Sequence, residues 1–459
     1  MTLAVDDLRV FAGNSALLGP VAVAVEPGRP LSILGETGAG KSLLAQAIMG
    51  ALPPGLSAQG AVRLGGLRLD TLPRREREAL WGRRVAMLPQ EPWRALDPLM
   101  RAEAQVAETH ARVAGLPGRE ARGRARDDLA RLGLDAQARS ALPGALSGGM
   151  AQRVAFAAAT AGGARVLLAD EPTKGLDAAR RDDVVRLLKA FAEGGGTLVT
   201  ITHDVAVARA LGGEALVLRS GAAVERGPAE RVLSAPASDY ARALVAAAPA
   251  NWPKAAPAEG GTPVIEADGR AIARAGRVLL DDIGFALGEG GRRALAGPSG
   301  LGKTSLLDTL AGLIAPAAGR VVRHGRARAP FAIQKIYQDP PAAFAARVPL
   351  AAGLRDLERR HRLPPGRLSG LLDRLGIAPE MLARRPDAVS GGELQRIALA
   401  RALALAPAVL LADEPTSRLD PVTRRQVMAV LGEAGAQAGT AERLLTPPPH
   451  NDESEGRRE

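Results

Sequence analysis

Two glycine-rich segments, one in each half of the chain, end in a lysine followed by a hydroxyl residue. Their glycines let the backbone curl so that consecutive N–H groups point at phosphate oxygens, and the helix that follows adds the positive end of its dipole. Lys41 and Lys303 would reach the β- and γ-phosphates of a nucleotide, while the hydroxyls of Ser42 and Thr304 would bind Mg²⁺. The predicted phosphate-binding residues are Gly35, Glu36, Thr37, Gly38, Ala39, Gly40, Lys41 and Ser42 in the first segment, and Gly297, Pro298, Ser299, Gly300, Leu301, Gly302, Lys303 and Thr304 in the second.

A pair of carboxylates follows an apolar strand pattern in each half. The run Val-Leu-Leu-Ala is followed by Asp-Glu-Pro-Thr both times. Acids at the carboxyl end of a strand in an open α/β sheet lie beside the phosphate loop. We therefore expect Asp170 and Asp413 to hold Mg²⁺, and Glu171 and Glu414 to polarise the water that attacks the terminal phosphate.

A third repeated motif stands upstream of each acidic pair. Leu146–Arg153 reads LSGGMAQR, Val389–Arg396 reads VSGGELQR, and each opens an Ala- and Leu-rich helical run. These segments resemble the signature motif of ATP-binding cassette (ABC) ATPases, which phosphate-loop enzymes in general do not carry, and the resemblance spans almost the whole chain. It implies that the first turn of each helix contacts the γ-phosphate of an ATP held by the opposite cassette, because free N–H groups at a helix start form an anion site. The residues matched in this way are Ser147, Gly148 and Gly149, and Ser390, Gly391 and Gly392.

Four other residues match functional positions of the family, and their roles come from the resemblance. Gln90 and Gln338 correspond to the glutamine that senses Mg²⁺ and the γ-phosphate and couples the site to membrane helices. Phe11 stands where the family places an aromatic ring against adenine, and a core phenylalanine is the alternative. His203 follows the β-branched strand pattern Thr197–Thr202 and resembles the switch histidine that orients the γ-phosphate and the attacking water.

The elements that position these motifs come in the same order in both halves. Leu31–Leu34 has the pattern of a buried strand, and it runs into the phosphate loop and then into the helical run Leu43–Met49. Ala294–Ala296 and Ser305–Leu313 repeat this strand and helix around the second loop. The predicted fold class is α/β, with two P-loop ABC nucleotide-binding domains. The resemblance implies that each has a RecA-like α/β core, an antiparallel β subdomain and a helical signature subdomain.

A chain of 459 residues exceeds what one hydrophobic core usually supports. We assign residues 1–245 to the first cassette and residues 264–446 to the second. Residues 246–263 are rich in Ala, Pro and Gly and lack apolar periodicity, so they are predicted to form a linker. The charged residues 447–459 are predicted to be a disordered tail.

Composition limits the setting in which this chain works. Cysteine is absent, which excludes disulfides, thiol catalysis and cysteine-bound metal. There is no run of about 20 apolar residues and no secretory signal pattern, so any membrane role would be peripheral. The resemblance implies a position at the cytoplasmic face of the inner membrane. The net charge of +11 comes from scattered arginines, and only 2% of the residues are aromatic, so no nucleic-acid partner is expected.

The second copy departs from the first at two places. Ala271–Val278 offers no aromatic ring for adenine. After Gly439–Thr440, the chain continues with residues 441–446 and three prolines, where the first copy has its strand and His203. Three consecutive prolines cannot form an interior strand, so we expect a cassette that is truncated or altered by an upstream frameshift. His450 follows the prolines too late to match the switch histidine.

Cassettes of this family pair head to tail, so each ATP would lie between one phosphate loop and the opposite signature. The first site would have every catalytic part, whereas the second would lack a switch histidine. We therefore expect the first site to hydrolyse ATP and the second mainly to bind it. The first site combines Lys41, Ser42, Gln90, Asp170, Glu171 and His203 with Ser390, Gly391 and Gly392, and the second combines Lys303, Thr304, Gln338, Asp413 and Glu414 with Ser147, Gly148 and Gly149.

Two segments resemble one subgroup of the family. Gln90–Pro98 (QEPWRALDP) and Ser238–Leu244 (SDYARAL) are similar to runs found in peptide and nickel importer ATPases. The resemblance implies import of peptides, or of nickel or another small solute, through transmembrane permease subunits and, indirectly, a solute-binding protein. Three alternatives stay open: an accessory ATPase of carbon–phosphorus bond cleavage, a decayed inactive product, and a ribosome-associated ATPase. The short, proline-rich linker argues against the last of these.

Overall fold

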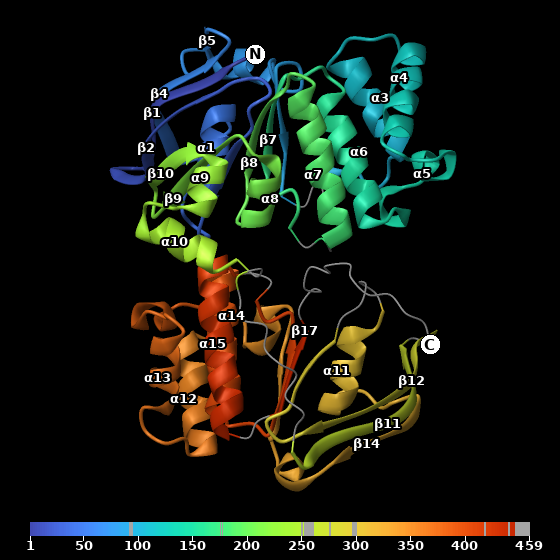
Figure 1. Ribbon diagram of the computed structural model, residues 1–459, viewed down its shortest axis with the longest axis vertical. Coiled ribbons are helices and arrows are strands. Elements are labelled where there is room, and N and C mark those ends of the chain that lie inside the picture. Colours follow the sequence, from blue (N-terminus) through green and yellow to red (C-terminus); the bar gives the residue numbers. More distant parts are fainter. Residues whose placement is uncertain are drawn as a thin grey trace. The chain divides into compact units, whose positions relative to one another are not determined.

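The computed structural model describes residues 1–90, 95–174, 176, 178–248, 251, 261–274, 277–295, 301–416, 419–438 and 441–445. The chain divides into two units, Met1–Asn251 and Trp252–Glu459 (Figure 1). Among the described residues, no helix is long and apolar enough to cross a membrane.

The first unit begins with an antiparallel sheet. Its strands are β1 (Leu3–Ala12), β2 (Ser15–Val25), β4 (Leu56–Leu64) and β5 (Leu67–Arg68), in the order β2-β1-β4-β5 (Figure 1). Buried and exposed residues alternate along β2 from Val21 to Val25. This alternation is typical of a sheet with one face on the core and one face in water.

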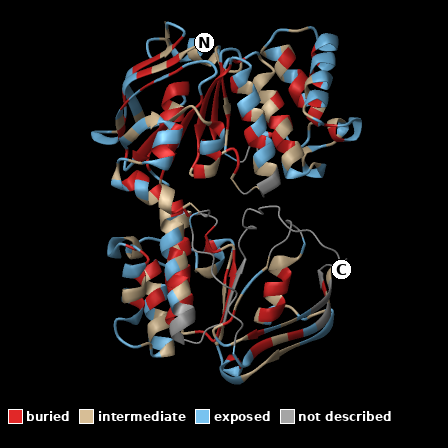
Figure 2. Cartoon of the chain, in the orientation of Figure 1, coloured by how far each residue is buried: buried red, intermediate tan, exposed pale blue. Residues whose placement is uncertain are grey.

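The second sheet of this unit carries the site. Its order is β10-β9-β3-β8-β7-β6, and neighbouring strands from β9 to β6 are parallel. The strands are β3 (Leu31–Gly35), β6 (Val85–Leu88), β7 (Val166–Asp170), β8 (Thr197–Ile201), β9 (Glu214–Arg219) and β10 (Ala222–Pro228). Every residue of β3, β7 and β8 is buried, as Figure 2 shows, because side chains pack on both faces of the sheet. Leu168 of β7 packs with α1 on one face, and Leu167 packs with α6 and α7 on the other.

The helices of the first unit cover these faces with amphipathic surfaces. In α4, for example, the buried residues are Ala121, Ala125 and Leu129, which are spaced four apart and so share one face. The helices are α1 (Lys41–Met49), α2 (Arg74–Glu78), α3 (Ala102–Arg112), α4 (Gly118–Arg131), α5 (Ala136–Ser140), η2 (Pro143–Ala145), α6 (Gly148–Thr160), α7 (Ala178–Glu193), α8 (Val205–Leu211), α9 (Ala229–Ser234) and α10 (Asp239–Ala246).

The second unit repeats this plan. An antiparallel sheet, β12-β11-β14, consists of β11 (Pro263–Arg274), β12 (Arg277–Gly288) and β14 (Ala318–Arg323). A parallel sheet, β13-β17-β16-β15, consists of β13 (Arg292–Ala294), β15 (Ile333–Ile336), β16 (Val409–Asp413) and β17 (Ala441–Leu445). The helices are α11 (Lys303–Ala311), η4 (Gly325–Arg328), η5 (Pro340–Ala343), α12 (Leu350–His361), α13 (Arg367–Arg374), η6 (Pro379–Ala383), η7 (Pro386–Ala388), α14 (Gly391–Ala404) and α15 (Pro421–Ala438). The predicted α/β class is confirmed in both units.

Strand β17 corrects the expectation for the end of the second cassette. It pairs in parallel with β13 and β16, so it is an interior strand of the described sheet. Leu445 pairs with Asp413, as Ile201 of β8 pairs with Asp170. Residues 441–445 therefore form a strand as long as β8.

Candidate functional site

The first phosphate loop joins β3 to α1. Gly40 starts α1 with φ of +92°, and a Cβ at this position would lie 2.8 Å from the Leu18 side chain, so the turn favours glycine. The buried Lys41 amino group donates hydrogen bonds to the carbonyl oxygens of Gly35 at 2.9 Å and Glu36 at 2.7 Å. The lysine is thus folded over the loop in which phosphates are predicted to bind.

Each hydroxyl at the start of a loop helix meets the aspartate at the end of a neighbouring strand. The Ser42 hydroxyl acts on the Asp170 carboxylate by lowering its pKa, and Thr304 Oγ1 donates to Asp413 Oδ2 at 2.7 Å. Burial raises the pKa of Asp170, while the Ser42 hydrogen bond and the charge of Lys41 act in the opposite direction. In each unit the structure therefore places a hydroxyl and an aspartate predicted to bind Mg²⁺ together. The other two predicted Mg²⁺ ligands, Gln90 and Gln338, contact Glu171 and Glu414.

Glu171 is the centre of a polar cluster in the first unit. His203 Nδ1 lies 3.1 Å from Glu171 Oε1, and Gln90 Nε2 donates to Oε2 at 3.5 Å. Burial alone would raise the pKa of Glu171, but the hydrogen bond and charge of His203, together with Lys174 and Lys41, outweigh it and lower the pKa to about 2. The carboxylate is consequently ionised at neutral pH.

Lys174 belongs to this cluster, although the motifs did not single it out. Its Nζ lies 3.6 Å from Glu171 Oε2, and its backbone N–H donates to the carbonyl oxygen of Glu171 at 3.1 Å. A signal existed in the sequence, because the repeated Asp-Glu-Pro-Thr is followed by Lys174 in one half and by Ser417 in the other.

The second unit repeats the glutamine–glutamate contact of the Glu171 cluster. Gln338 Nε2 donates to Glu414 Oε2 at 3.2 Å, and Gly302 starts α11 with φ of +95°, as Gly40 starts α1. Leu301, Gly302, Lys303 and Thr304 are described, whereas Gly297, Pro298, Ser299 and Gly300 lie outside the described residues.

Strand register identifies the residue that takes the place of His203. His203 stands two residues after Ile201, and the residue two after the equivalent Leu445 is Pro447. A proline side chain has no group that could donate or accept a hydrogen bond. Pro447 and His450 both lie outside the described residues.

Both signature serines are exposed and start helices. The Ser147 hydroxyl accepts from the backbone N–H of Met150 at 3.3 Å. Ser390 instead forms a capping box with Glu393: its hydroxyl donates to Glu393 Oε2 at 2.7 Å and accepts from the Glu393 N–H at 3.3 Å. No described hydrogen bond joins Ser147 to the phosphate loop of its own unit.

The family model described as "ABC transporter" matches residues 18–174 and 280–417 of this chain. The chain belongs to the ABC transporter family. This ABC protein is an ATPase that binds and hydrolyses ATP for a transporter, as the sequence predicted.

Relatives resemble the chain over almost its whole length. The peptidoglycan transport ATP-binding protein YejF of Agrobacterium fabrum is 33% identical over 472 residues, which cover 95% of this ABC chain and 86% of that protein. The glutathione import ATP-binding protein GsiA of Escherichia coli is 31% identical over 510 residues, covering 96% and 81%. Among solved structures, the dimer of the ATP-binding cassette MJ0796 with ADP and phosphate is 28% identical with a TM-score of 0.44, and covers 50% of this chain and 98% of that one.

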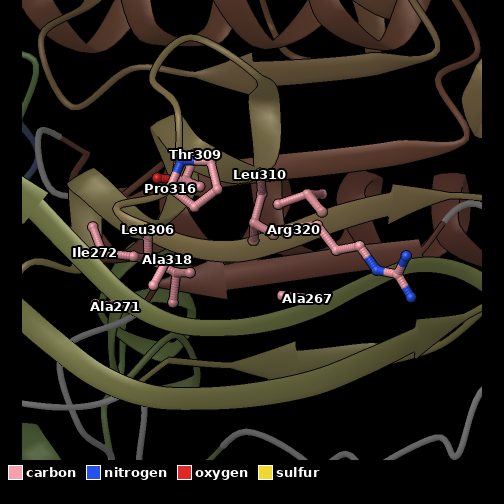
Figure 3. A pocket seen from close by; sticks show the side chains of 10 residues that line it. Ala267, Ala271, Ile272, Leu306, Thr309, Leu310, Pro316, Ala318 and Arg320 are labelled. Atoms are coloured by element: carbon pink, nitrogen blue, oxygen red, sulfur yellow. The ribbon is translucent and has the colours of Figure 1, made fainter.

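Phe11 lies on β1 of this ABC protein, opposite Ala16 of β2 and Ser57 of β4, and is half-buried. Its predicted contact with adenine stays a prediction. Figure 3 shows a small cavity in the second unit, where Ala271 and Ile272 of β11 lie against Leu306 of α11.

Proposed function

We propose that this ABC ATPase drives the import of peptide-bearing solutes. The observation that supports it is the near full-length similarity to a peptidoglycan transport protein and a glutathione import protein. Glutathione is a tripeptide and peptidoglycan is linked through peptides, so peptide-containing solutes are the chemistry that the two share. Nickel or another small solute is the alternative substrate within the same importer subgroup.

Head-to-tail pairing of the two cassettes is the second part of the proposal. Each ATP would then bind to one phosphate loop and to the first turn of the opposite signature helix. The exposure of Ser147 and Ser390 supports this arrangement, because a helix N-terminus that faces solvent can bind an anion of a partner domain. Residues 246–263 would be the linker that allows the two cassettes to meet.

In the first site, Lys41 would exchange its bonds to Gly35 and Glu36 for phosphate oxygens. Ser42 and Asp170 would hold Mg²⁺, since hard oxygen donors are the ligands this ion prefers. The ion supplies charge neutralisation of the β- and γ-phosphate oxygens when it is bound. The ionised Glu171, held by His203, would accept a hydrogen bond from the attacking water and so raise its nucleophilicity.

In the second site, Thr304 and Asp413 would hold Mg²⁺, and Gln338 would contact Glu414. The register that aligns Pro447 with His203 supports a site that binds ATP and hydrolyses it slowly. The same glutamines, Gln90 and Gln338, would sense the nucleotide and transmit its state to the membrane subunits.

Transmembrane permease subunits and, indirectly, a solute-binding protein would be the partners. A pocket of about 210 Å³ in the second unit, lined by Leu313, Ile333, Tyr337 and Arg401 among others, would receive part of a permease. The ATPase would then lie peripherally at the cytoplasmic face of the inner membrane. The names of the relatives do not favour the carbon–phosphorus cleavage or ribosome-associated alternatives, because they describe transport.

Reconstitution tests this proposal. The purified chain is combined with its permease subunits in lipid vesicles, and ATP hydrolysis and uptake of labelled glutathione or of a labelled dipeptide are measured. We expect hydrolysis that increases with the permease and uptake that is lost in Glu171→Gln. ATP hydrolysis whose rate does not change when the permease is added would contradict the importer role. Co-purification of the ATPase activity with ribosomes would contradict it as well.

A further inference from the structure

A buried glutamine links the signature helix to the acidic loop in the first unit. Gln152 lies on α6, five residues after Ser147, and is 1% exposed. Its Nε2 donates a hydrogen bond to the carbonyl oxygen of Pro172, the residue directly after Glu171. One side-chain contact therefore joins the helix that begins at the signature to the loop that carries the proposed base.

The equivalent glutamine of the second unit lacks this bond. Gln395 stands on α14, five residues after Ser390, and is likewise 1% exposed. Neither its Nε2 nor its Oε1 has a hydrogen-bond partner among the residues that the structure describes. The corresponding carbonyl belongs to Pro415, which is buried and follows Glu414.

The arginine that follows each glutamine makes corresponding contacts in the two helices. Arg153 donates to the carbonyl oxygens of Gly149 at 3.3 Å and Leu132 at 2.9 Å. The corresponding Arg396 donates to Gly392 at 3.4 Å and Leu375 at 2.8 Å. The arginine contacts of the two helices thus correspond, whereas the glutamine contacts differ.

An amide buried without a hydrogen bond destabilises a fold, and such groups are rare in native proteins. The glutamine at this position forms a hydrogen bond in the first unit (Gln152) and none in the second (Gln395), so the contact has two arrangements. A rigid helix transmits a displacement of its first turn to a residue five positions later, which lies about 7.5 Å along the axis. Phosphate binding at Ser390 would therefore displace Gln395.

We propose that Gln152 and Gln395 are positioning residues that couple the two ATP sites, and that Gln395 bonds to the Pro415 carbonyl when ATP occupies the opposite phosphate loop. This inference rests on the proposed head-to-tail pairing. ATP at the first site contacts the signature of α14, and Gln395 passes its presence to the loop that holds Asp413 and Glu414. In the reverse direction, Gln152 passes the presence of ATP at the second site to Glu171.

Thermal unfolding with and without ATP tests whether Gln395 gains a hydrogen bond when ATP binds. The experiment uses Glu171→Gln as the parent, so that ATP stays intact, and compares it with the same chain carrying Gln395→Met. Methionine fills a similar volume and needs no hydrogen bond. We expect the Tm without nucleotide to rise by about 2–4 °C, because an unpaired amide is removed. The increase in Tm caused by ATP should become smaller, because the variant cannot form the new bond. If ATP raises the Tm of the variant as much as it raises the Tm of the parent, the coupling is wrong and Gln395 is only a packing defect.

Turnover kinetics test the bonded state independently. Gln152→Met in the otherwise natural chain should lower kcat about fivefold while the KM for ATP changes less than about twofold, because only the loop of Glu171 is misplaced. An unchanged kcat would contradict the positioning role. Glu171→Gln distinguishes failure of the proposed base from failure of the coupling. If this variant still hydrolyses ATP, Glu171 is not the base. If it is inactive while Gln152→Met has normal activity, only the coupling is wrong.

Discussion

His203 Nδ1 lies 3.1 Å from Glu171 Oε1 because the strands before these residues are parallel neighbours. Asp170, the last residue of β7, pairs with Ile201, the last residue of β8, so both chains leave the sheet at the same edge. A histidine at this edge can hold the carboxylate in one orientation while its other ring nitrogen stays available.

His203→Ala should lower the kcat for ATP hydrolysis by about 100-fold or more, with a smaller effect on the KM, because the group that orients the base is removed. Steady-state ATPase assays of the transporter measure both constants. His450→Ala is the matched control and should leave both unchanged. Equal losses in the two variants would show that His203 has no special role.

Glu171→Gln should abolish turnover, whereas Glu414→Gln should change it little, because only the first carboxylate has a histidine partner in the proposed scheme. Single-turnover measurements with trapped ATP would show one nucleotide hydrolysed per chain in the natural protein. The prediction fails if Glu414→Gln is the more damaging change.

Lys174→Ser copies the residue of the second repeat and should lower kcat about threefold. The effect is small because the lysine side chain is 35% exposed and the ion pair is partly screened by water. Lys174→Arg keeps the charge and should retain most of the activity. A loss in the arginine variant as large as that in the serine variant would argue against an electrostatic role.

Thr304→Val should destabilise the nucleotide-free protein by about 1–2 kcal/mol, because the buried Asp413 carboxylate loses a hydrogen-bond donor. Thr304→Ser keeps the hydroxyl and serves as the control. Urea unfolding followed by circular dichroism measures both. If valine and serine give the same midpoint, the Asp413 contact contributes nothing to stability.

Asp70 provides a pH-dependent contribution to stability in the first antiparallel sheet. The Arg68 hydrogen bond, assisted by the backbone N–H of Val62, lowers the pKa of Asp70 to about 2. A folded-state pKa below the unfolded value of 3.8 stabilises the native state above that value, and this contribution is lost as the pH falls from about 4 to about 2. Asp70→Asn should therefore lower the urea midpoint at pH 7 but not at pH 2. Equal effects at the two pH values would contradict this assignment.

The repeated motifs could be read from the sequence because each is a short contiguous segment with its own local preference. Gly40 and Gly302 terminate their loops in the left-handed region as their motif requires, and Ser147 and Ser390 begin helices as their neighbours suggest. The meeting of Ser42 with Asp170 also followed from the sequence, because strands of a parallel sheet end at one edge.

By itself, the sequence determined the family, the α/β class and the presence of two cassettes in tandem, and it predicted the residues of each phosphate loop. Only the tertiary structure decided that Lys174 joins Glu171, that Gln152 is bonded while Gln395 is not, and that Leu445 pairs with Asp413 as Ile201 pairs with Asp170. Each of these depends on strand register and side-chain placement between segments far apart in the chain. Such contacts arise from the packing of whole elements, and no local pattern of residues encodes them.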